Sequence, residues 1–342
     1  MTTPSNPSKT KNKLSTILAE NEKPIVLDGA LATYLETLGA DISSALWSAH
    51  LLTTSPSLIK RTHLDYFHAG ATIAITSSYQ ASVPGLTKHL SITPAEARAL
   101  ICKSVDLARE ARDEYVSILT SKSNSGKEDG GKKASEDLLI AGSVGPYGAY
   151  LADGSEYTGS YSGALSMDEF KDFHRERIDA LMKAGVDVLA IETIPSFTEA
   201  QALVSLLEDE FPEAEAWFSF TLAGEDETGT RIADGTRVSD VLALLESYRG
   251  VVAVGVNCVG EDVAARALVE MGRYTKKPLV VYPNSGEVWD AEGRKWDGER
   301  TGGKGVAERT RALRKAGARI VGGCCRCTPE DIKVVAETLR GE

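Results

Sequence analysis

The chain has 342 residues, of which 42% are hydrophobic and 25% charged, which is typical of a soluble globular protein with a large core. Its net charge of −11 argues against a nucleic-acid-binding surface, because contacts to phosphates need clustered Lys and Arg. No stretch approaches the roughly 20 apolar residues that cross a bilayer, and five cysteines are too few for a disulfide-stapled secreted fold, so we expect a cytoplasmic protein without membrane contact.

The N-terminal segment MTTPSNPSKTKNK is polar, rich in Ser, Thr and Lys, and lacks acidic residues. This composition slightly resembles an organellar transit peptide, but the segment contains no Arg and has little apolar content before Leu14. We therefore expect residues 1–20 to form a disordered tail ahead of the folded domain.

Eight short apolar runs rich in β-branched residues follow, and a helical pattern comes after each of them. The runs occupy residues 24–30, 71–79, 137–145, 186–193, 216–222, 251–258, 278–285 and 318–325. Their nearly continuous hydrophobicity indicates strands buried on both faces, as in a parallel sheet covered by helices. Eight strand and helix units predict a single (β/α)8 TIM barrel, an α/β fold, over residues 21–342. A doubly wound open sheet is the alternative.

Other local signals refine this pattern. A Ser or Thr followed three residues later by Glu occurs at 93–96, 166–169 and 196–199, and each pair predicts the start of a helix by a capping box. The segment near 121–137, SKSNSGKEDGGKKASED, is polar and glycine-rich. We expect it to form a flexible surface insertion before the third strand.

Residues that can bind or react stand where several of the predicted strands end. They are Asp28 and Gly29 at the end of the first run, Tyr79 at the second, Glu192 at the fourth, Asn257 and Cys258 at the sixth, and Cys324 and Cys325 at the eighth. In a barrel of this kind the reactive residues lie at the C-terminal ends of the strands. We therefore expect these side chains to meet on one rim.

Cys258, Cys324 and Cys325 predict a zinc site. Thiolates favour zinc over magnesium or calcium, and three protein ligands, where a structural zinc site has four, leave one position for a substrate. Neighbouring side chains on a strand point to opposite faces, so the adjacent pair reaches one metal only where the strand breaks, and Gly322 and Gly323 permit that break. The alternative is that these cysteines are small buried hydrophobes.

Two further cysteines are left outside this ligand set. Cys102 falls within a helical core pattern, and Cys327 lies beside the expected helix cap at Thr328. The carboxylates of Asp28 and Glu192 instead suggest a clamp for a substrate ammonium group, with Gly29 allowing the backbone a close approach. Helix N-capping is the alternative for both carboxylates.

With these motifs the chain resembles the S-methylmethionine-dependent type of the homocysteine S-methyltransferase family. The resemblance covers about residues 24–337 and rests on DGALAT (28–33), TSSYQAS (76–82), GSVGPYGAYLADGSEYTGSY (142–161), IETIPS (191–196), GVNC (255–258), YPNSGEVWD (282–290) and VGGCC (321–325). One departure is Ala32, where the first motif of the family usually has glycine. The resemblance implies a (β/α)8 barrel with Zn²⁺ on the three cysteines. It also implies that Asp28, Gly29 and Glu192 contact homocysteine, and we add Tyr79 and Asn257 as candidate substrate-binding residues.

The implied reaction transfers a methyl group from a sulfonium donor, S-methylmethionine or S-adenosylmethionine, to the thiol of L-homocysteine and gives methionine. Tyr147, Tyr150, Tyr157 and Tyr161 are candidates to hold the sulfonium by cation–π contact, or else they pack the loop. Alternatives are selenocysteine or selenohomocysteine as the acceptor, and a barrel with structural zinc and a binding role. A metal-assisted lyase is less compatible, because none of the five histidines stands at a predicted strand end. We expect a monomer or a small homo-oligomer.

Overall fold

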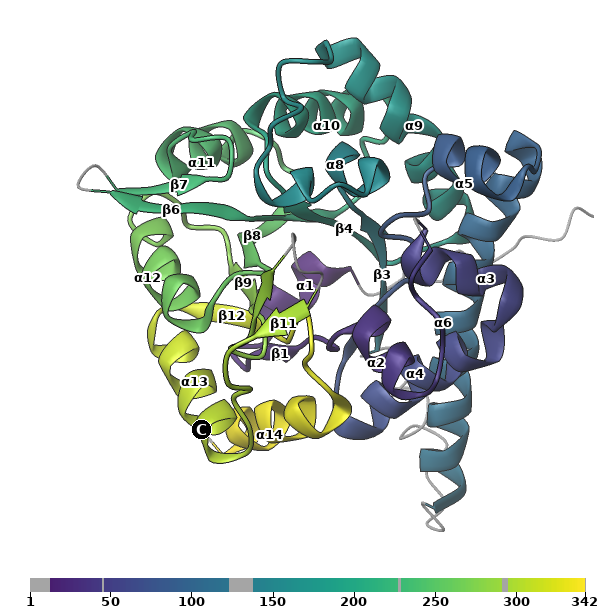
Figure 1. Cartoon of the computed structure of the whole chain (residues 1–342). Helices are drawn as coiled ribbons and strands as arrows, with labels where there is room; N and C mark the ends of the chain where they lie inside the picture. The colour runs from purple at the N-terminus through teal and green to yellow at the C-terminus, as the bar shows by residue number, and fades with distance from the viewer. Residues whose placement is uncertain (1–12, 45, 123–137, 227–228, 291–294, 342) are drawn as a thin grey trace, which may run out of the picture.

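A parallel sheet of eight strands forms the centre of the computed structural model, which describes residues 13–44, 46–122, 138–226, 229–290 and 295–341 (Figure 1). The strands are β1 (Ile25–Val26), β2 (Ile73–Ile75), β3 (Leu139–Val144), β4 (Val188–Ile194), β5 (Ala216–Phe220), β8 (Val251–Asn257), β9 (Leu279–Tyr282) and β12 (Ala318–Val321). Their order is β1-β12-β9-β8-β5-β4-β3-β2. A parallel bridge between Leu27 and Ile73 joins the two outer strands. The sheet thus closes on itself, and the predicted TIM barrel is confirmed.

Most of the helices surround the strands in a ring, whereas the first helix, Leu14–Glu20, lies at the centre of the barrel in this view (Figure 1). The helices are α1 (Leu14–Glu20), α2 (Leu31–Thr37), η1 (Trp47–His50), α3 (Leu51–Thr54), α4 (Pro56–Ala69), α5 (Val83–Leu90), α6 (Pro94–Lys122), α8 (Tyr147–Leu151), η2 (Ser155–Tyr157), α9 (Met167–Ala184), α10 (Phe197–Glu210), α11 (Val238–Glu246), α12 (Glu261–Met271), α13 (Lys304–Lys315) and α14 (Pro329–Arg340). None of these helices, within the described ranges, is long and apolar enough to span a membrane.

Two small antiparallel hairpins extend the connections after β5 and β9. One pairs β6 (Leu222–Asp226) with β7 (Gly229–Ile232), and the other pairs β10 (Val288–Asp290) with β11 (Lys295–Asp297). The fifth predicted run, 216–222, therefore contains β5 and the first residue of a hairpin. The eighth run is shorter than expected, because β12 ends at Val321 and leaves the two adjacent cysteines in the loop that follows.

Two of the three predicted capping boxes form, at the starts of α6 and α9. At the start of α10, Ser196 accepts a hydrogen bond from the backbone of Glu199, but the carboxylate does not return it. The Glu199 side chain is fully buried and binds His174 and Tyr161 instead. A buried carboxylate with partners in the interior does not need the exposed backbone of a helix end.

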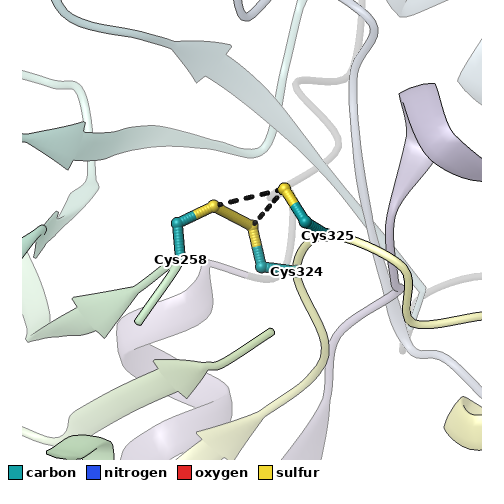
Figure 2. A group of neighbouring side chains, drawn as sticks. All are labelled: Cys258, Cys324 and Cys325. Carbon is teal, nitrogen blue, oxygen red and sulfur yellow. Dashed lines mark hydrogen bonds between the residues drawn. A yellow bond between two sulfur atoms is a disulfide. The ribbon is translucent and has the colours of Figure 1, made fainter. Parts of the chain in front are cut away.

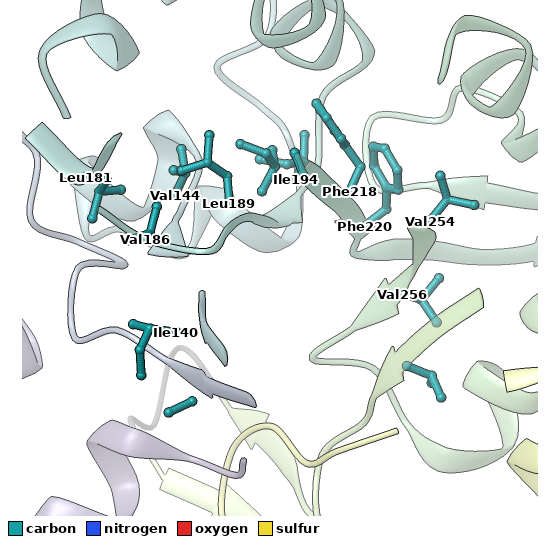
Figure 3. Packing of buried hydrophobic residues seen from close by; sticks show 14 of the residues in the cluster. Ile140, Val144, Leu181, Val186, Leu189, Ile194, Phe218, Phe220, Val254 and Val256 are labelled. Carbon is teal, nitrogen blue, oxygen red and sulfur yellow. The ribbon is translucent and has the colours of Figure 1, made fainter. Parts of the chain in front are cut away.

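Buried apolar side chains form two layers, one between the strands and the helices (Figure 3) and one inside the barrel. In β4 the layers alternate: Leu189 and Ile191 belong to the outer layer, whereas Val188 and Ala190 lie in the barrel interior. Side chains two residues apart on a strand share a face. Glu192 continues the inward series, so the regular alternation of the strand points its carboxylate into the barrel.

Helix α1 closes the barrel at the end opposite the cysteines. Leu14 and Leu18 are buried among the side chains that fill the barrel interior. Ser15 binds Glu215, which directly precedes β5, and Arg319 in β12 donates a hydrogen bond to the carbonyl of Leu18. These contacts place α1 at the N-terminal ends of the strands.

The expectation of a disordered tail over residues 1–20 is therefore wrong for Leu14–Glu20. The polar segment before Leu14 dominates the composition of residues 1–20 and therefore suggested disorder. Two leucines four residues apart nevertheless share one helix face and supply an apolar contact. Residues 1–12 lie outside the described part of the chain. The same holds for 123–137, so the flexible insertion expected near 121–137 stays a prediction, while Ser121 and Lys122 form the end of α6.

We predict that Leu14→Ala lowers the free energy of unfolding by about 2–5 kcal/mol, because it opens a cavity beneath the barrel. Chemical denaturation of the purified protein measures this change. Thr16→Ala, at an exposed position of the same helix, is the matched control and should change stability by less than about 0.5 kcal/mol. Equal effects of the two substitutions would show that α1 does not plug the barrel.

Candidate active site

A cavity of about 600 Å³ opens at the C-terminal ends of the barrel strands. Its volume is within the range of small-molecule sites. The residues predicted from the strand ends all line it, namely Asp28, Gly29, Tyr79, Glu192, Asn257, Cys258, Cys324 and Cys325. Segments up to about 300 residues apart in the chain therefore contribute to one cavity, as the closed barrel requires.

The three predicted zinc ligands lie together on the wall of this cavity (Figure 2). Their Sγ atoms all lie within 4.8 Å of one another, with 3.8 Å between Cys258 and Cys325 and 4.0 Å between Cys324 and Cys325. Cys258 and Cys324 are joined by a disulfide. A tetrahedral zinc ion with bonds of about 2.3 Å holds its sulfur ligands about 3.8 Å apart. The residues present thus fit a zinc ion once the disulfide is reduced.

The backbone that presents these cysteines adopts an unusual conformation at Cys258 and at Arg326, which directly follows Cys325. Cys258 follows β8 with φ of 53°, in the left-handed region that a residue with a side chain seldom adopts. Gly322 and Gly323, by contrast, do not have positive φ. A Cβ on Gly322 would lie 2.6 Å from Cβ of Leu27, and one on Gly323 would lie 2.4 Å from Cβ of Cys327. Close packing is therefore the reason for both glycines, and the conformational freedom that we inferred from the sequence is not needed.

Burial controls the protonation of the cysteine thiols. It raises the pKa of Cys325 to about 12, so this thiol keeps its proton unless a metal ion replaces it. Cys102 lies in α6, where its thiol contacts the carbonyl of Ala180, and Cys327 is buried with its thiol facing the carbonyl of Pro283. Neither belongs to the group of three sulfurs.

Asp28 and Glu192 are held by hydrogen bonds across neighbouring strands. The carboxylate of Asp28 accepts a hydrogen bond of 2.8 Å from the backbone N–H of Ile75, and Glu192 accepts one from the hydroxyl of Ser143. Neither residue is the N-cap of the helix that follows it. The helix-capping alternative is therefore wrong for both carboxylates.

Both carboxylates are buried, with exposed fractions of 3% for Asp28 and 7% for Glu192. Burial raises the pKa of Asp28 well above its ordinary value and raises that of Glu192 to about 7. Hydrogen bonds from Ser143 and Tyr282 and the positive charge of Arg177 oppose the shift of Glu192 only in part. A bound cation would restore the ionised form of either carboxylate.

Gly29 lines the cavity, but its missing side chain serves a different contact. A Cβ at this position would lie 2.7 Å from the carbonyl oxygen of Cys327 and 2.8 Å from the ring of Tyr66. The hydroxyl of Tyr66 in turn donates to the carbonyls of Ala30 and Cys327. Tyr66 thus ties the loop after β1 to the loop that carries the cysteines, and only glycine leaves room for its ring.

Asn257 joins the ends of β4 and β8. Its side-chain oxygen accepts hydrogen bonds from the backbone N–H of Thr193 and the hydroxyl of Ser219, and its nitrogen donates to the hydroxyl of Thr193. Thr193 has φ of 62°, a strained conformation for a β-branched residue. These hydrogen bonds hold Thr193 against Asn257. Thr193 directly follows Glu192, and Asn257 directly precedes Cys258, so the pair links the two candidate site residues.

The four candidate tyrosines separate into two groups. Tyr157 lines the cavity. Tyr147, Tyr150 and Tyr161 do not line it and pack instead in an aromatic cluster that includes Phe173. Loop packing is therefore the alternative that fits these three residues, and Tyr157 is the one of the four that lines the cavity.

Glu156 is a lining residue that the sequence did not reveal. It is buried, with an exposed fraction of 3%, and burial raises the pKa of its carboxyl to about 7. It belongs to η2, in the long connection between β3 and α9, so a search of strand ends cannot find it. Its position within the 142–161 motif was the available signal.

Comparison with known proteins gives a consistent result. The family model described as homocysteine S-methyltransferase matches residues 25–339. Homocysteine S-methyltransferase of Escherichia coli (strain K12) is 45% identical over 92% of this chain and 95% of its own length. Homocysteine S-methyltransferase YbgG of Bacillus subtilis (strain 168) is 46% identical over 92% of this chain and 94% of its own length. The metallated crystal form of the E. coli homocysteine methyltransferase MmuM superimposes with a TM-score of 0.78 at 44% identity, covering 94% of this chain and 98% of that one.

Proposed function

Because the chain belongs to the homocysteine S-methyltransferase family, we propose that it transfers a methyl group from a sulfonium donor, S-methylmethionine or S-adenosylmethionine, to the thiol of L-homocysteine, with zinc held by Cys258, Cys324 and Cys325. The observation that carries this proposal is a set of three sulfurs that suits one zinc ion once the disulfide is reduced, in the cavity that also contains the buried carboxylates of Asp28 and Glu192. Three ligands leave the fourth position of a tetrahedral ion for the substrate sulfur.

Asp28 and Glu192 would receive the ammonium group of homocysteine. Each is buried, and hydrogen bonds from neighbouring residues fix its direction. A cation restores the ionised form that burial disfavours, so binding and ionisation support each other. Gly29 and Tyr79 line the same region and would contact the amino acid backbone. For Asn257 the hydrogen bonds to Thr193 support a positioning role beside the substrate.

The main contribution of the protein to the reaction would be to align the reacting atoms of the two substrates. Zinc, when bound, would lower the pKa of the substrate thiol, so that homocysteine reacts as a thiolate at neutral pH. The donor carries its own leaving group, since the thioether departs without a proton, and no general acid is needed. Holding the two sulfurs and the methyl carbon in line can contribute on the order of 7–11 kcal/mol.

The proposed ligand set requires three reduced thiols. The disulfide between Cys258 and Cys324 removes two of them, so the oxidised chain cannot use the full set. A reducing cytosol keeps such thiols free. We therefore assign the activity to the cytosol.

The assay that tests this proposal uses reduced, zinc-loaded protein with L-homocysteine and one donor at a time. We expect methionine from S-methylmethionine, from S-adenosylmethionine or from both, and the ratio of kcat/KM values identifies the preferred donor. Selenocysteine in place of homocysteine tests the selenium acceptor in the same assay. Absence of product with every pair of substrates would contradict the proposed function.

A further inference from the structure

The charged side chains that the described residues contribute to the cavity wall are all acidic. Its lining includes six carboxylate side chains, those of Asp28, Glu36, Asp41, Asp153, Glu156 and Glu192. Lys, Arg and His are absent from its lining among the described residues. A cavity lined by negative charges raises the local concentration of cations and disfavours anions. The site therefore suits ligands that bring positive charge.

Glu156 differs from the other buried carboxylates in this wall. Asp28 has the N–H of Ile75 as a partner, and Glu192 has the hydroxyl of Ser143. Oε2 of Glu156 is buried and has no hydrogen-bond partner within the described part of the protein. A buried polar atom without a partner costs free energy, and a carboxylate costs more than a neutral group. Because Oε2 of Glu156 lies in a ligand cavity, we expect a bound ligand to supply its missing partner.

The backbone around Glu156 is fixed by contacts on both sides. The carbonyl of Glu156 accepts a hydrogen bond of 3.1 Å from the hydroxyl of Thr221. A Cβ on Gly148 would lie 2.5 Å from the backbone nitrogen of Glu156, so α8 packs directly against this peptide. Tyr161, four residues beyond Tyr157, is anchored to the buried Glu199. A carboxylate on such a rigid support is preorganised for its ligand.

Glu156 shares its cavity with the cysteines. It lines the same cavity as Cys325, and the residue directly after it, Tyr157, lines that cavity as well. Asp28 and Glu192 already account for one ammonium group, that of the acceptor. Glu156 remains available for the positive charge of the second substrate.

We propose that Glu156 determines the specificity for a cationic methyl donor by placing its carboxylate against the sulfonium centre. This inference rests on the proposed function and names the residue that selects the donor. In the transfer, the bond between the donor sulfur and its methyl carbon breaks and its electron pair stays on that sulfur. The lone pair of the homocysteine thiolate forms the new bond to carbon. Both charges disappear and no proton moves.

This charge balance predicts which kinetic constant Glu156 controls. The positive charge on the donor decreases as the methyl group leaves, so a carboxylate beside it stabilises the bound donor more than the transition state. Removing the carboxylate should therefore weaken donor binding without lowering kcat, so that the loss is found in the KM for the donor. The affinity for homocysteine should stay unchanged, because its ammonium group has other partners.

The test uses reduced, zinc-loaded wild-type protein and the variants Glu156→Gln, Glu156→Asp and Glu36→Gln. We expect Glu156→Gln to raise the KM for S-methylmethionine by about 10- to 100-fold, because the sulfonium loses the negative charge beside it. Glu156→Asp keeps the charge and should recover part of the affinity. Glu36→Gln removes the same charge from an exposed position of the same wall and should change the KM by less than about twofold.

Binding of trimethylsulfonium ion, which has no ammonium group, separates the possible failures. It needs no turnover, so it can be measured by equilibrium titration even if no donor gives product. We expect Glu156→Gln to weaken this binding by the same factor as it raises the KM for S-methylmethionine. Unchanged binding in folded Glu156→Gln protein would overturn the assignment to the sulfonium, whereas the proposed function fails only if wild-type protein gives no methionine.

Discussion

Replacing Cys324 with Ser should remove both the bound zinc and methyl-transfer activity. Cys324 supplies one of three sulfurs that lie within 4.8 Å of one another, and a hydroxyl is a poor ligand for zinc in a thiolate site. With the two remaining protein ligands, the zinc ion should dissociate into solvent. We expect the zinc content to fall below about one tenth of the wild-type value. The kcat/KM for homocysteine should fall at least about 1000-fold, which is more than the loss of a residue that only hydrogen-bonds a metal ligand costs.

Cys327→Ser is the matched control, because Cys327 lies on the same loop and is more deeply buried. A serine hydroxyl preserves the donor that faces the carbonyl of Pro283. We expect this variant to retain zinc and activity within about threefold. Metal analysis and steady-state kinetics on both variants decide the ligand set. Full zinc occupancy in Cys324→Ser, or its loss in Cys327→Ser, would show that the set is wrong.

Glu192→Gln should weaken homocysteine binding and at the same time stabilise the ligand-free protein. The substitution keeps an acceptor for the hydroxyl of Ser143 but removes the charge that would pair with the ammonium group. We expect the KM for homocysteine to rise about 10- to 100-fold. The KM for the donor should change little, since Glu156 is the proposed partner of the sulfonium.

The stability effect follows from the direction of the pKa shift. Burial raises the pKa of Glu192 from 4.5 to about 7, so folding favours the protonated carboxyl. The wild-type protein therefore loses stability as the pH rises from about 4.5 to 7, and the full penalty, on the order of 3 kcal/mol, is present above pH 7. Glutamine carries no charge and avoids this penalty.

Chemical denaturation at two pH values checks this expectation. At pH 8 the unfolding free energy of ligand-free Glu192→Gln should exceed that of the wild type by up to about 3 kcal/mol. At pH 4.5 the difference should largely vanish, because the wild-type carboxyl is then protonated. A variant that binds homocysteine normally would contradict the proposed clamp, and one that is less stable at pH 8 would contradict the account of its burial.

The fold followed from the sequence because each barrel strand is buried on both faces and therefore reads as an apolar run. The same property located the site, since polar residues such as Asp28 and Glu192 stand out where an apolar run stops. Helix α1 was missed because its apolar contact with the barrel rests on the short set Leu14, Ile17 and Leu18. Such a set next to a polar tail is a weak signal without the barrel interior against which it packs.

The reasons for individual residues were harder to read than their positions. Gly29 was correctly placed at the cavity, but the atoms that require it belong to Tyr66 and Cys327, which no local pattern connects to it. Glu156 was missed because it lies in a long loop, where burial depends on contacts with distant segments such as the hydroxyl of Thr221. Long-range packing of this kind is not encoded in local periodicity.

In the proposed site three cysteines hold zinc, with one position open for the sulfur of homocysteine. X-ray absorption at the zinc edge measures the ligands directly, on reduced protein loaded with one zinc per chain. We predict three sulfur ligands and one lighter atom before substrate is added, and four sulfur ligands after L-homocysteine is added. A shell with four protein ligands that stays unchanged on addition of homocysteine would contradict the account and indicate a structural zinc site.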